Sequence, residues 1–243
     1  MEFRFNVNEV LKTPLVKIGN SLIPSDYAGP RRMLYDTISK VGEIVNEMGS
    51  ASAKSQGLLR PLTTTDKLKN SQHDLYLAVD QTANYGRGAV AGMLKTGKKS
   101  LYVLDRLGRE YQVKAPFLFD FYVPENKQRM GWGKFLYDSL LWQNDLEPAK
   151  IAYDQPTDAL SNFLSKHYGL SDAVKQPTRF VVYDGFFSNE EGQPMETTKS
   201  EIVEDDFEED KIPLGRSRRN PKYELVIPDE DEEEMYRPKN LLE

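Results

Sequence analysis

The chain has 243 residues, of which 39% are hydrophobic and 29% are charged, as in an ordinary globular protein. It contains no cysteine and two histidines, which excludes disulfide scaffolds, thiolate or histidine-rich metal sites and cysteine nucleophiles. No apolar run approaches the roughly 20 residues of a membrane helix. The formal net charge of −6, taken over the whole chain, argues against nucleic acid as a partner.

The charge is distributed unevenly along the chain. Residues 190–243 hold 18 acidic and 8 basic side chains, a net charge of −10, which leaves +4 for residues 1–189. The acidic part has few aromatic residues and no apolar periodicity, so it does not bury enough surface to offset its chain entropy. We therefore predict one domain over 1–189 and a disordered acidic tail over 190–243. The tail is either a solvating appendage or an electrostatic regulator that folds back on the basic domain.

The first half of the domain alternates helical and strand patterns. Apolar residues at helical spacing predict a helix over 31–49, which Gly49 would end. The small, polar stretch over 50–70 that follows it has the pattern of a loop, and a short helix within it stays an alternative. LYLAVD at 75–80 predicts a strand, and the runs at 89–97 and 100–105 predict a hairpin with a Gly–Lys turn between them.

The second half follows a regular order of strand, helix, strand, helix and strand. Strong β-formers predict a strand over 117–123, followed by a helix over 131–143. A short strand over 150–154 precedes a helix over 156–170, and TRFVVYDGFF at 178–187 predicts the last strand. Together these elements predict an α+β fold with a mixed, mostly antiparallel sheet flanked by helices.

The segment between the strand at 117–123 and its following helix has the pattern of an anion-binding loop. Gly131 and Gly133 let the backbone approach a ligand, and the first N–H groups of the helix point at it together with the positive end of the helix dipole. Arg129 and Lys134 add positive charge. The spacing differs from a Walker loop and from a dinucleotide-binding fingerprint, so we predict a different pyrophosphate cradle.

A strand followed by Q-x-x-G-x-G and a helix resembles motif A of the GNAT acetyltransferases, which hold the pyrophosphate arm of acetyl-CoA in this way. The longer run E-x-x-Q-R-x-G-x-G-K is similar to the alpha-tubulin N-acetyltransferases. The resemblance extends to EMGSASAKSQGL at 47–58, to the lysine-rich stretch 95–99, to FLSKHYGL at 163–170 and to FVVYDGFF at 180–187. It covers most of residues 1–188 and none of the acidic tail.

The resemblance implies a GNAT fold, acetyl-CoA as co-substrate and no metal. Coenzyme contacts in that family lie along the motif strand, its loop and the start of the next two helices. The matching residues are Phe121, Tyr122, Val123, Gln128, Arg129, Met130, Gly131, Trp132, Gly133, Lys134, Thr157, Ala159, Leu160, Phe163 and Lys166.

The resemblance also implies two catalytic residues, Asp154 and Gln56. A lysine amine with a pKa near 10.4 is protonated at neutral pH, and a carboxylate at a strand end can orient it and accept its proton. From the residues alone, a helix N-cap just before Pro156 is the favoured role of Asp154. Glutamine is not a base, so Gln56 would orient the substrate amine or a water by hydrogen bonding.

The implied substrate is a lysine of alpha-tubulin in microtubules, which attacks acetyl-CoA directly. Residues around the cleft are implied to dock tubulin, and a positive rim would suit an acidic partner. They are Leu62, Lys67, Lys95 and Lys99. We further expect a cytoplasmic, microtubule-associated monomer that binds neither nucleic acid nor membranes.

Three positions depart from the family pattern. Phe117 stands where the family commonly has a cysteine, Gln155 where an arginine is usual, and Ala159 where a lysine is usual. The last two remove positive charge near the expected coenzyme phosphates, which predicts weaker acetyl-CoA binding or a relaxed lysine substrate. Two alternative functions therefore stay open: a GNAT enzyme that acts on another lysine or amine, and a weakened homologue that binds tubulin or microtubules without turnover.

Overall fold

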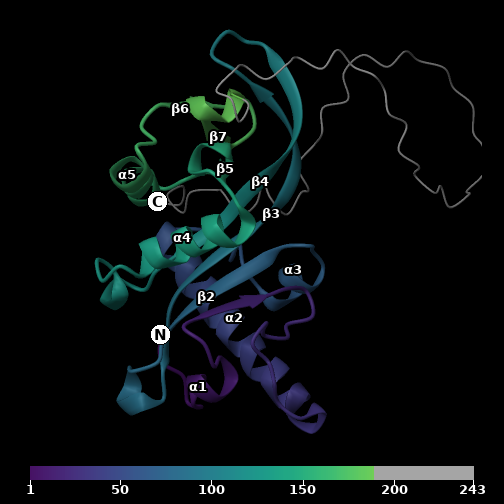
Figure 1. Ribbon diagram of the computed structural model, residues 1–243, viewed down its shortest axis with the longest axis vertical. Coiled ribbons are helices and arrows are strands. Elements are labelled where there is room, and N and C mark those ends of the chain that lie inside the picture. Colours follow the sequence, from purple (N-terminus) through teal and green to yellow (C-terminus); the bar gives the residue numbers. More distant parts are fainter. Residues whose placement is uncertain (189–243) are drawn as a thin grey trace, which may run out of the picture.

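The computed structural model describes residues 1–188, and within these residues seven strands form a single sheet in the order β1-β2-β3-β4-β5-β7-β6 (Figure 1). Their bounds are β1 Leu15–Ile18, β2 Asp74–Asp80, β3 Ala89–Leu104, β4 Glu110–Tyr122, β5 Ala152–Asp154, β6 Ala173–Lys175 and β7 Phe180–Tyr183. Every neighbouring pair is antiparallel apart from β4 and β5, which run parallel. The predicted mixed, mostly antiparallel sheet is therefore confirmed.

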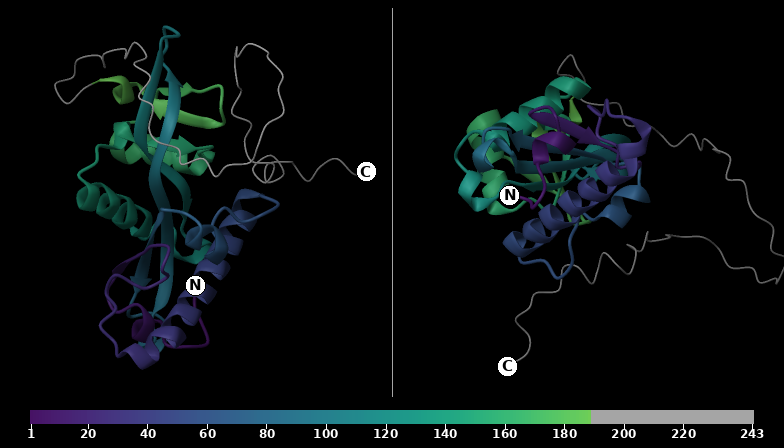
Figure 2. Two further views of the ribbon diagram at one scale, coloured as in Figure 1. Left: turned by 90° about the vertical axis from the view of Figure 1, so that its right-hand side faces the viewer. Right: turned by 90° about the horizontal axis from the view of Figure 1, so that it is seen from below.

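Helices cover both faces of this sheet. Their bounds are α1 Val7–Val10, α2 Leu34–Gln56, α3 Thr65–Lys69, α4 Trp132–Asn144 and α5 Asp158–Tyr168. Single turns of 3-10 helix span Arg31–Met33, Asn84–Gly86, Glu125–Lys127, Pro148–Lys150 and Asp184–Phe187. The left view of Figure 2 shows α2 and α4 on opposite sides of the long β3–β4 ribbon.

The alternation of side chains along β2 explains how both faces are buried. Leu75, Leu77 and Val79 belong to the core that packs under α2, whereas Tyr76 and Ala78 belong to the core under α4 and α5. Because successive strand residues point to opposite faces, a strand that is apolar throughout requires cover on both sides. The near-continuous apolar run LYLAV thus accounts for helices on both faces.

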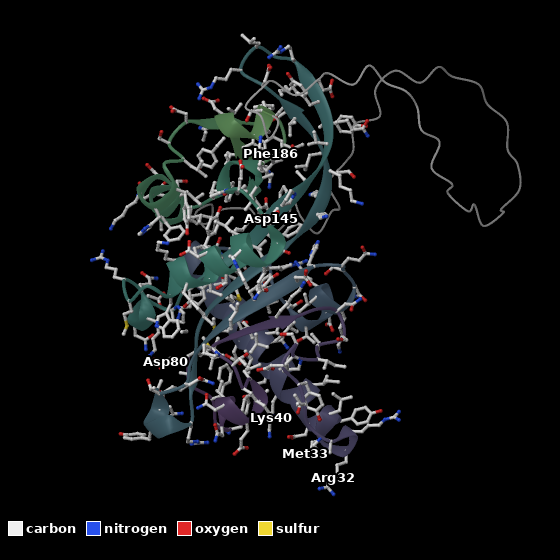
Figure 3. The ribbon with its side chains drawn as sticks, in the orientation of Figure 1. Arg32, Met33, Lys40, Asp80, Asp145 and Phe186 are labelled. Carbon is white, nitrogen blue, oxygen red and sulfur yellow. The ribbon has the colours of Figure 1, made fainter. Side chains whose placement is uncertain are left out.

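The β3–β4 ribbon extends past the rest of the sheet and builds a third core. Leu101, Val103 and Phe117 on the ribbon pack with Phe180 and Phe186 near the end of the described chain. Phe186 is labelled in Figure 3, beside the upper part of the ribbon. This cluster attaches the last strands to the ribbon and so fixes the position of β5 between them.

The pairing of β4 with β5 is short, and this positions the candidate site. Phe117 pairs with Ala152 and Leu118 with Tyr153, after which β5 ends at Asp154 while β4 continues to Tyr122. On its other side, β4 carries an extra residue, Phe119, between its pairings with Thr96 and Lys95 of β3. Such a bulge increases the local twist and turns the strand away from its neighbour.

The helix predicted over 31–49 is longer than expected and the predicted stop at Gly49 is wrong. The helix α2 continues to Gln56 and ends at Gly57, which adopts the left-handed conformation with φ 70°. Gly49 has a different role, because a β-carbon there would lie 1.8 Å from the carbonyl oxygen of Thr63. The glycine lets the chain around Thr63 pass directly against the helix.

The hairpin predicted around the Gly–Lys pair is also wrong, because β3 is one continuous strand through that region. A β-carbon at Gly97 would lie 2.6 Å from Cδ2 of His73, so this glycine makes room for a ring and not for a turn. The turn that joins β3 to β4 follows Leu104, where RLGRE at 106–110 predicts a turn. There the carboxylate of Asp105 accepts hydrogen bonds from the N–H groups of Leu107 and Arg109, each at 2.9 Å.

The remaining predicted elements agree in type with the structure, with shifted ends. The last predicted strand is shortened to β7, followed by the turn Asp184–Phe187. The sequence analysis missed α1, β1 and β6, whereas α3 is the short helix allowed as an alternative within the loop-like stretch 50–70. The predicted disordered tail over 190–243 lies outside the described residues. Within the described residues, no helix is both long and apolar enough to cross a membrane.

We predict that Gly49→Ala destabilises the fold by about 1–3 kcal/mol, because the new methyl group meets backbone atoms that cannot rotate away. The measurement is the free energy of unfolding in urea. The matched control is Gly42→Ala in the same helix, where the nearest atom would lie 3.7 Å away. This control should stabilise the helix by up to about 1 kcal/mol. Equal effects of the two changes would contradict the steric explanation.

Candidate active site

The predicted cradle forms where β4 leads into α4. The side-chain amide of Gln128 donates to the carbonyl oxygen of Val123 at 2.9 Å and so closes the loop between strand and helix. Gly131 is the N-cap of α4 with φ 90°, a left-handed conformation that favours glycine, and no side chain caps the helix there. An uncapped helix N-terminus presents backbone N–H groups and a positive dipole end to an anion.

The charged side chains of the cradle fall into two groups. Arg129 is exposed, whereas Lys134 pairs with Asp138 one turn further along α4. In the loop before α4, Lys127 forms an ion pair with Asp80 at 2.7 Å, with each side chain 15% exposed, and this bond lowers the pKa of Asp80. Figure 3 labels Asp80 at the end of β2. The sequence analysis missed this anchor, because a lysine in a polar loop carries no sign of a partner in a distant strand.

The helix α5 meets the start of α4 through aromatic packing. The ring of Phe163 lies 5.5 Å from that of Phe121 and 5.9 Å from that of Tyr137, measured between centroids. A β-carbon on Gly133 would lie 3.4 Å from Phe121 and 3.8 Å from Phe163. The two segments predicted to contact the coenzyme are therefore adjacent.

The residues expected to contact the coenzyme differ in how exposed they are to a ligand. Tyr122 and Leu160 are buried in the core, and the backbone N–H of Leu160 is already bound by the Thr157 hydroxyl at 3.2 Å. Met130, by contrast, is 62% exposed at the cradle. The other exposed or half-buried expected contacts are Phe121, Val123, Gln128, Arg129, Gly131, Trp132, Gly133, Lys134, Thr157, Ala159, Phe163 and Lys166.

A pocket of about 130 Å³ opens beside the separation of β4 and β5. Its lining residues are Gln56, Leu58, Leu62, Asp154, Gln155 and Thr157. The structure thus brings together both residues predicted to be catalytic, one predicted to dock substrate and one predicted to contact coenzyme. They come from the end of α2, the following loop, the end of β5 and the start of α5.

Asp154 is the last residue of β5 and is half-buried. The alternative that it caps the next helix is wrong, since the N-cap of α5 is Thr157. The following residue, Gln155, has φ 33°, which is strained for a residue other than glycine. Its backbone N–H donates to the carbonyl of Arg179 at 3.1 Å, and its buried Nε2 has no hydrogen-bond partner in the described part of the chain.

Gln56 is held by a buried acid that the sequence analysis missed. Its Nε2 donates to Ser52 Oγ at 2.8 Å and to Asp120 Oδ1 at 3.1 Å. Asp120 lies in β4, is 2% exposed and also accepts from the hydroxyls of Ser52 at 2.7 Å and Thr63 at 2.6 Å. Burial raises the pKa of Asp120, while these bonds and the charge of Lys95 oppose the rise. The available signal was a single acid inside the otherwise apolar run FLFDFYV.

The predicted substrate rim is corrected at one position. Lys95 is only 5% exposed, because its ammonium group donates to the carbonyl of Leu62 at 2.8 Å and lies over the ring of Phe119. It therefore shapes the loop that lines the pocket and contributes little exposed charge. Lys67 and Lys99 are exposed, as a rim requires.

His73 packs against β3 at Gly97 and against β4 at Phe119. Its ring stacks on Phe119 with centroids 4.0 Å apart. Burial, followed by the charges of Lys95 and Lys99, lowers the pKa of His73 to about 4. The imidazole is thus neutral near pH 7, and the positive charge beside the pocket comes from lysines. Among the described residues, no group of acidic or histidine side chains is arranged to hold a metal.

A mixed sheet whose parallel strands separate beside a glycine-lined helix N-terminus defines the GNAT class of acetyltransferases. The sequence profile of a family described as GNAT acetyltransferase, Mec-17, matches residues 3–210. The chain belongs to this family, and the resemblance given above is confirmed at that level. The match runs past the predicted domain boundary at residue 189.

Relatives named alpha-tubulin N-acetyltransferase are similar over most of this chain. The Anopheles gambiae protein is 45% identical over 78% of this chain, the Aedes aegypti protein 43% over 82%, and the Drosophila melanogaster protein 40% over 79%. The matches span 39%, 75% and 42% of those relatives, respectively. Among solved structures, the KacTA–DNA complex overlays with a TM-score of 0.35 at 11% identity, covering 49% of this chain and 72% of that one, which is too low to carry an argument.

Membership of the GNAT family implies acetyl-CoA as the acetyl donor. The residues of the cradle fit its pyrophosphate arm, since an uncapped helix start with a glycine N-cap is an anion site. The roles of the individual residues remain predictions.

We predict that Gly131→Ala weakens acetyl-CoA binding about tenfold, because a β-carbon would project into the open cradle and disfavour the left-handed N-cap. The measurement is isothermal titration calorimetry. The matched control is Gly169→Ala at the end of α5, which has φ 68° and equally open surroundings. It should cost similar stability and leave the affinity unchanged. Equal losses of affinity in both variants would contradict a local role for Gly131.

Proposed function

We propose that this protein transfers the acetyl group of acetyl-CoA to a lysine side chain of alpha-tubulin in microtubules. The observation that carries the proposal is the pocket that joins Gln56 and Asp154 at the separation of β4 and β5. The names of the relatives supply the substrate. A microtubule substrate implies a cytoplasmic, microtubule-associated protein, and a pocket lined by one chain is compatible with a monomer.

The proposed chemistry is direct attack of the amine on a thioester. The carboxylate of Asp154 orients the lysine ammonium and takes or relays one of its protons, which leaves a nucleophilic lone pair on nitrogen. The nitrogen forms a bond to the acetyl carbon and the carbon–sulfur bond breaks. The nitrogen then loses its second proton to give the neutral amide, and the departing thiolate gains one proton, so that one proton is released overall. Backbone N–H groups of β4 beyond its pairing with β5 are candidates to bind the oxyanion.

Charge around the pocket supports a negatively charged partner. Lys67 and Lys99 are exposed, and residues 1–189 have a net charge of +4. Exposed lysines contribute mainly to the rate of encounter with an acidic surface and less to the final affinity. Such a rim suits an acidic protein filament and gives no reason to expect nucleic acid.

The weakened homologue remains a second candidate because of specific observations. Phe117 is 2% exposed and packs against Phe119 and Phe180, so this position offers no reactive group. Gln155 and Ala159 bring no charge to the pocket or to the start of α5. A protein with these features could retain the docking surface while turning over slowly.

One experiment separates the candidates: microtubules, labelled acetyl-CoA and either the native protein or Asp154→Asn. We expect label on alpha-tubulin, and a loss of about a hundredfold or more in the variant. Co-sedimentation with microtubules in the absence of label would favour the binding homologue. Label only on other proteins would favour an enzyme with another substrate. An Asp154→Asn variant that folds and retains full activity would contradict the role of Asp154.

We predict that Gln155→Arg/Ala159→Lys binds acetyl-CoA about tenfold more tightly, because two cations near the start of α5 would attract the coenzyme phosphates. Calorimetry measures the affinity. The control, Ser100→Lys/Gln112→Lys, adds the same charge on exposed positions of the β3–β4 ribbon. If Gln155→Arg/Ala159→Lys binds acetyl-CoA no more tightly than the native chain does, the prediction that Gln155 and Ala159 weaken coenzyme binding is wrong.

A further inference from the structure

The buried carboxylate of Asp120 is the centre of a hydrogen-bond network that ends at the pocket. One oxygen, Oδ1, accepts from Ser52 Oγ at 2.7 Å and from Gln56 Nε2 at 3.1 Å. The other, Oδ2, accepts from Thr63 Oγ1 at 2.6 Å. In each of these bonds the neighbour is the donor and a carboxylate oxygen of Asp120 is the acceptor.

This network determines which way the side-chain amide of Gln56 is turned. The Ser52 hydroxyl has one proton, which it gives to Asp120, so its oxygen accepts from Gln56 at 2.8 Å. Both N–H bonds of the Gln56 amide are thereby used. A flipped amide would place its carbonyl oxygen against the carboxylate oxygen and against a hydroxyl whose proton is already committed. Two contacts between acceptors would result, so the network fixes the nitrogen inward.

The same geometry leaves the carbonyl oxygen of Gln56, Oε1, for the pocket that this residue lines together with Asp154. A carbonyl oxygen accepts hydrogen bonds and cannot donate to a thioester or to its oxyanion. Together with the carboxylate of Asp154, which lines the same pocket, it gives that pocket two side chains that can accept hydrogen bonds. A primary ammonium group, which carries three donors, is the chemical class that such a pair binds.

We propose that Asp120 is a positioning residue, which holds Gln56 as a hydrogen-bond acceptor for the incoming substrate amine. The inference rests on the proposed acetyl transfer and assigns Gln56 to the amine side of the reaction, away from the oxyanion. Asp120 acts only through Gln56, and its other contacts hold α2 and the Thr63 segment against β4.

Exchanging the amide and the carboxylate tests whether Gln56 turns its nitrogen toward Asp120 and its oxygen toward the pocket. In Asp120→Asn the negative charge is lost and one of the two acceptor oxygens becomes a donor, so the network holds the Gln56 amide less firmly with its nitrogen inward. We expect kcat/KM for microtubules to fall about tenfold to a hundredfold, the factor for one hydrogen bond to a charged group. Acetyl-CoA affinity should stay unchanged. Asp120→Asn/Gln56→Glu restores one carboxylate, one amide and an acceptor facing the pocket, so it should recover most of the activity.

Two hydroxyl deletions provide matched controls. Ser52→Ala and Thr63→Val each remove one donor from Asp120, and both residues are fully buried. Both should lower the thermal midpoint, but only Ser52 also holds Gln56, so only Ser52→Ala should lower kcat/KM. Three results would overturn the proposal. The first is an equal loss of activity in Ser52→Ala and Thr63→Val, and the second is full activity of Asp120→Asn. The third is a double variant Asp120→Asn/Gln56→Glu that is no more active than the less active of its two single variants.

A measurement that does not depend on activity separates this inference from the proposed function. In ¹⁵N-labelled protein, the side-chain NH₂ signal that disappears in Gln56→Glu should exchange with water about tenfold more slowly than exposed glutamines. This protection should be lost in Asp120→Asn. Fast exchange in the native protein would overturn the positioning role even if microtubules are acetylated. Protected exchange without acetyl transfer would leave the positioning role supported and the proposed function contradicted.

Discussion

The short parallel pairing of β4 and β5 is the constraint on which the rest of the site depends. Only Phe117 and Leu118 of β4 pair with β5, and the bulge at Phe119 turns β4 away just beyond them. A sheet that stayed paired would leave neither free backbone groups nor space for a ligand. The cradle at the end of β4 and Asp154 at the end of β5 lie on the two sides of this opening.

A buried charge next to that opening requires its own set of partners. Asp120 is 2% exposed, and an unpaired carboxylate in such a position would be strongly destabilising. Its three donors come from α2 and from the segment around Thr63, which reaches β4 only because residue 49 has no side chain. One glycine and two hydroxyls therefore make an acidic side chain tolerable in the core, and of the two hydroxyls only that of Ser52 also contacts Gln56.

The sequence predicted the fold class and the cradle because both depend on local patterns. Gly131 before an amphipathic helix, and Gln128 three residues earlier, sufficed to predict the strand–loop–helix geometry at which we expect the coenzyme to bind. Gly49 led to a wrong helix end and Gly97 to a wrong hairpin turn. Each glycine is required by a close contact with a residue distant in the sequence, and not by the local backbone. Asp120, Ser52 and Thr63 were missed for the same reason, and Lys95 was assigned to the surface because its partner, a backbone carbonyl, leaves no trace in the sequence.

The topology also has a consequence for the order in which the molecule folds. The β3–β4 ribbon joins residues that are close along the chain through the tight turn at Asp105, so closing it costs little chain entropy. The pocket, by contrast, needs Gln56 and Asp154, which are separated by most of the domain. We expect the ribbon to form early and the pocket late. During refolding, amides of the ribbon should thus become protected from hydrogen exchange before those of β5.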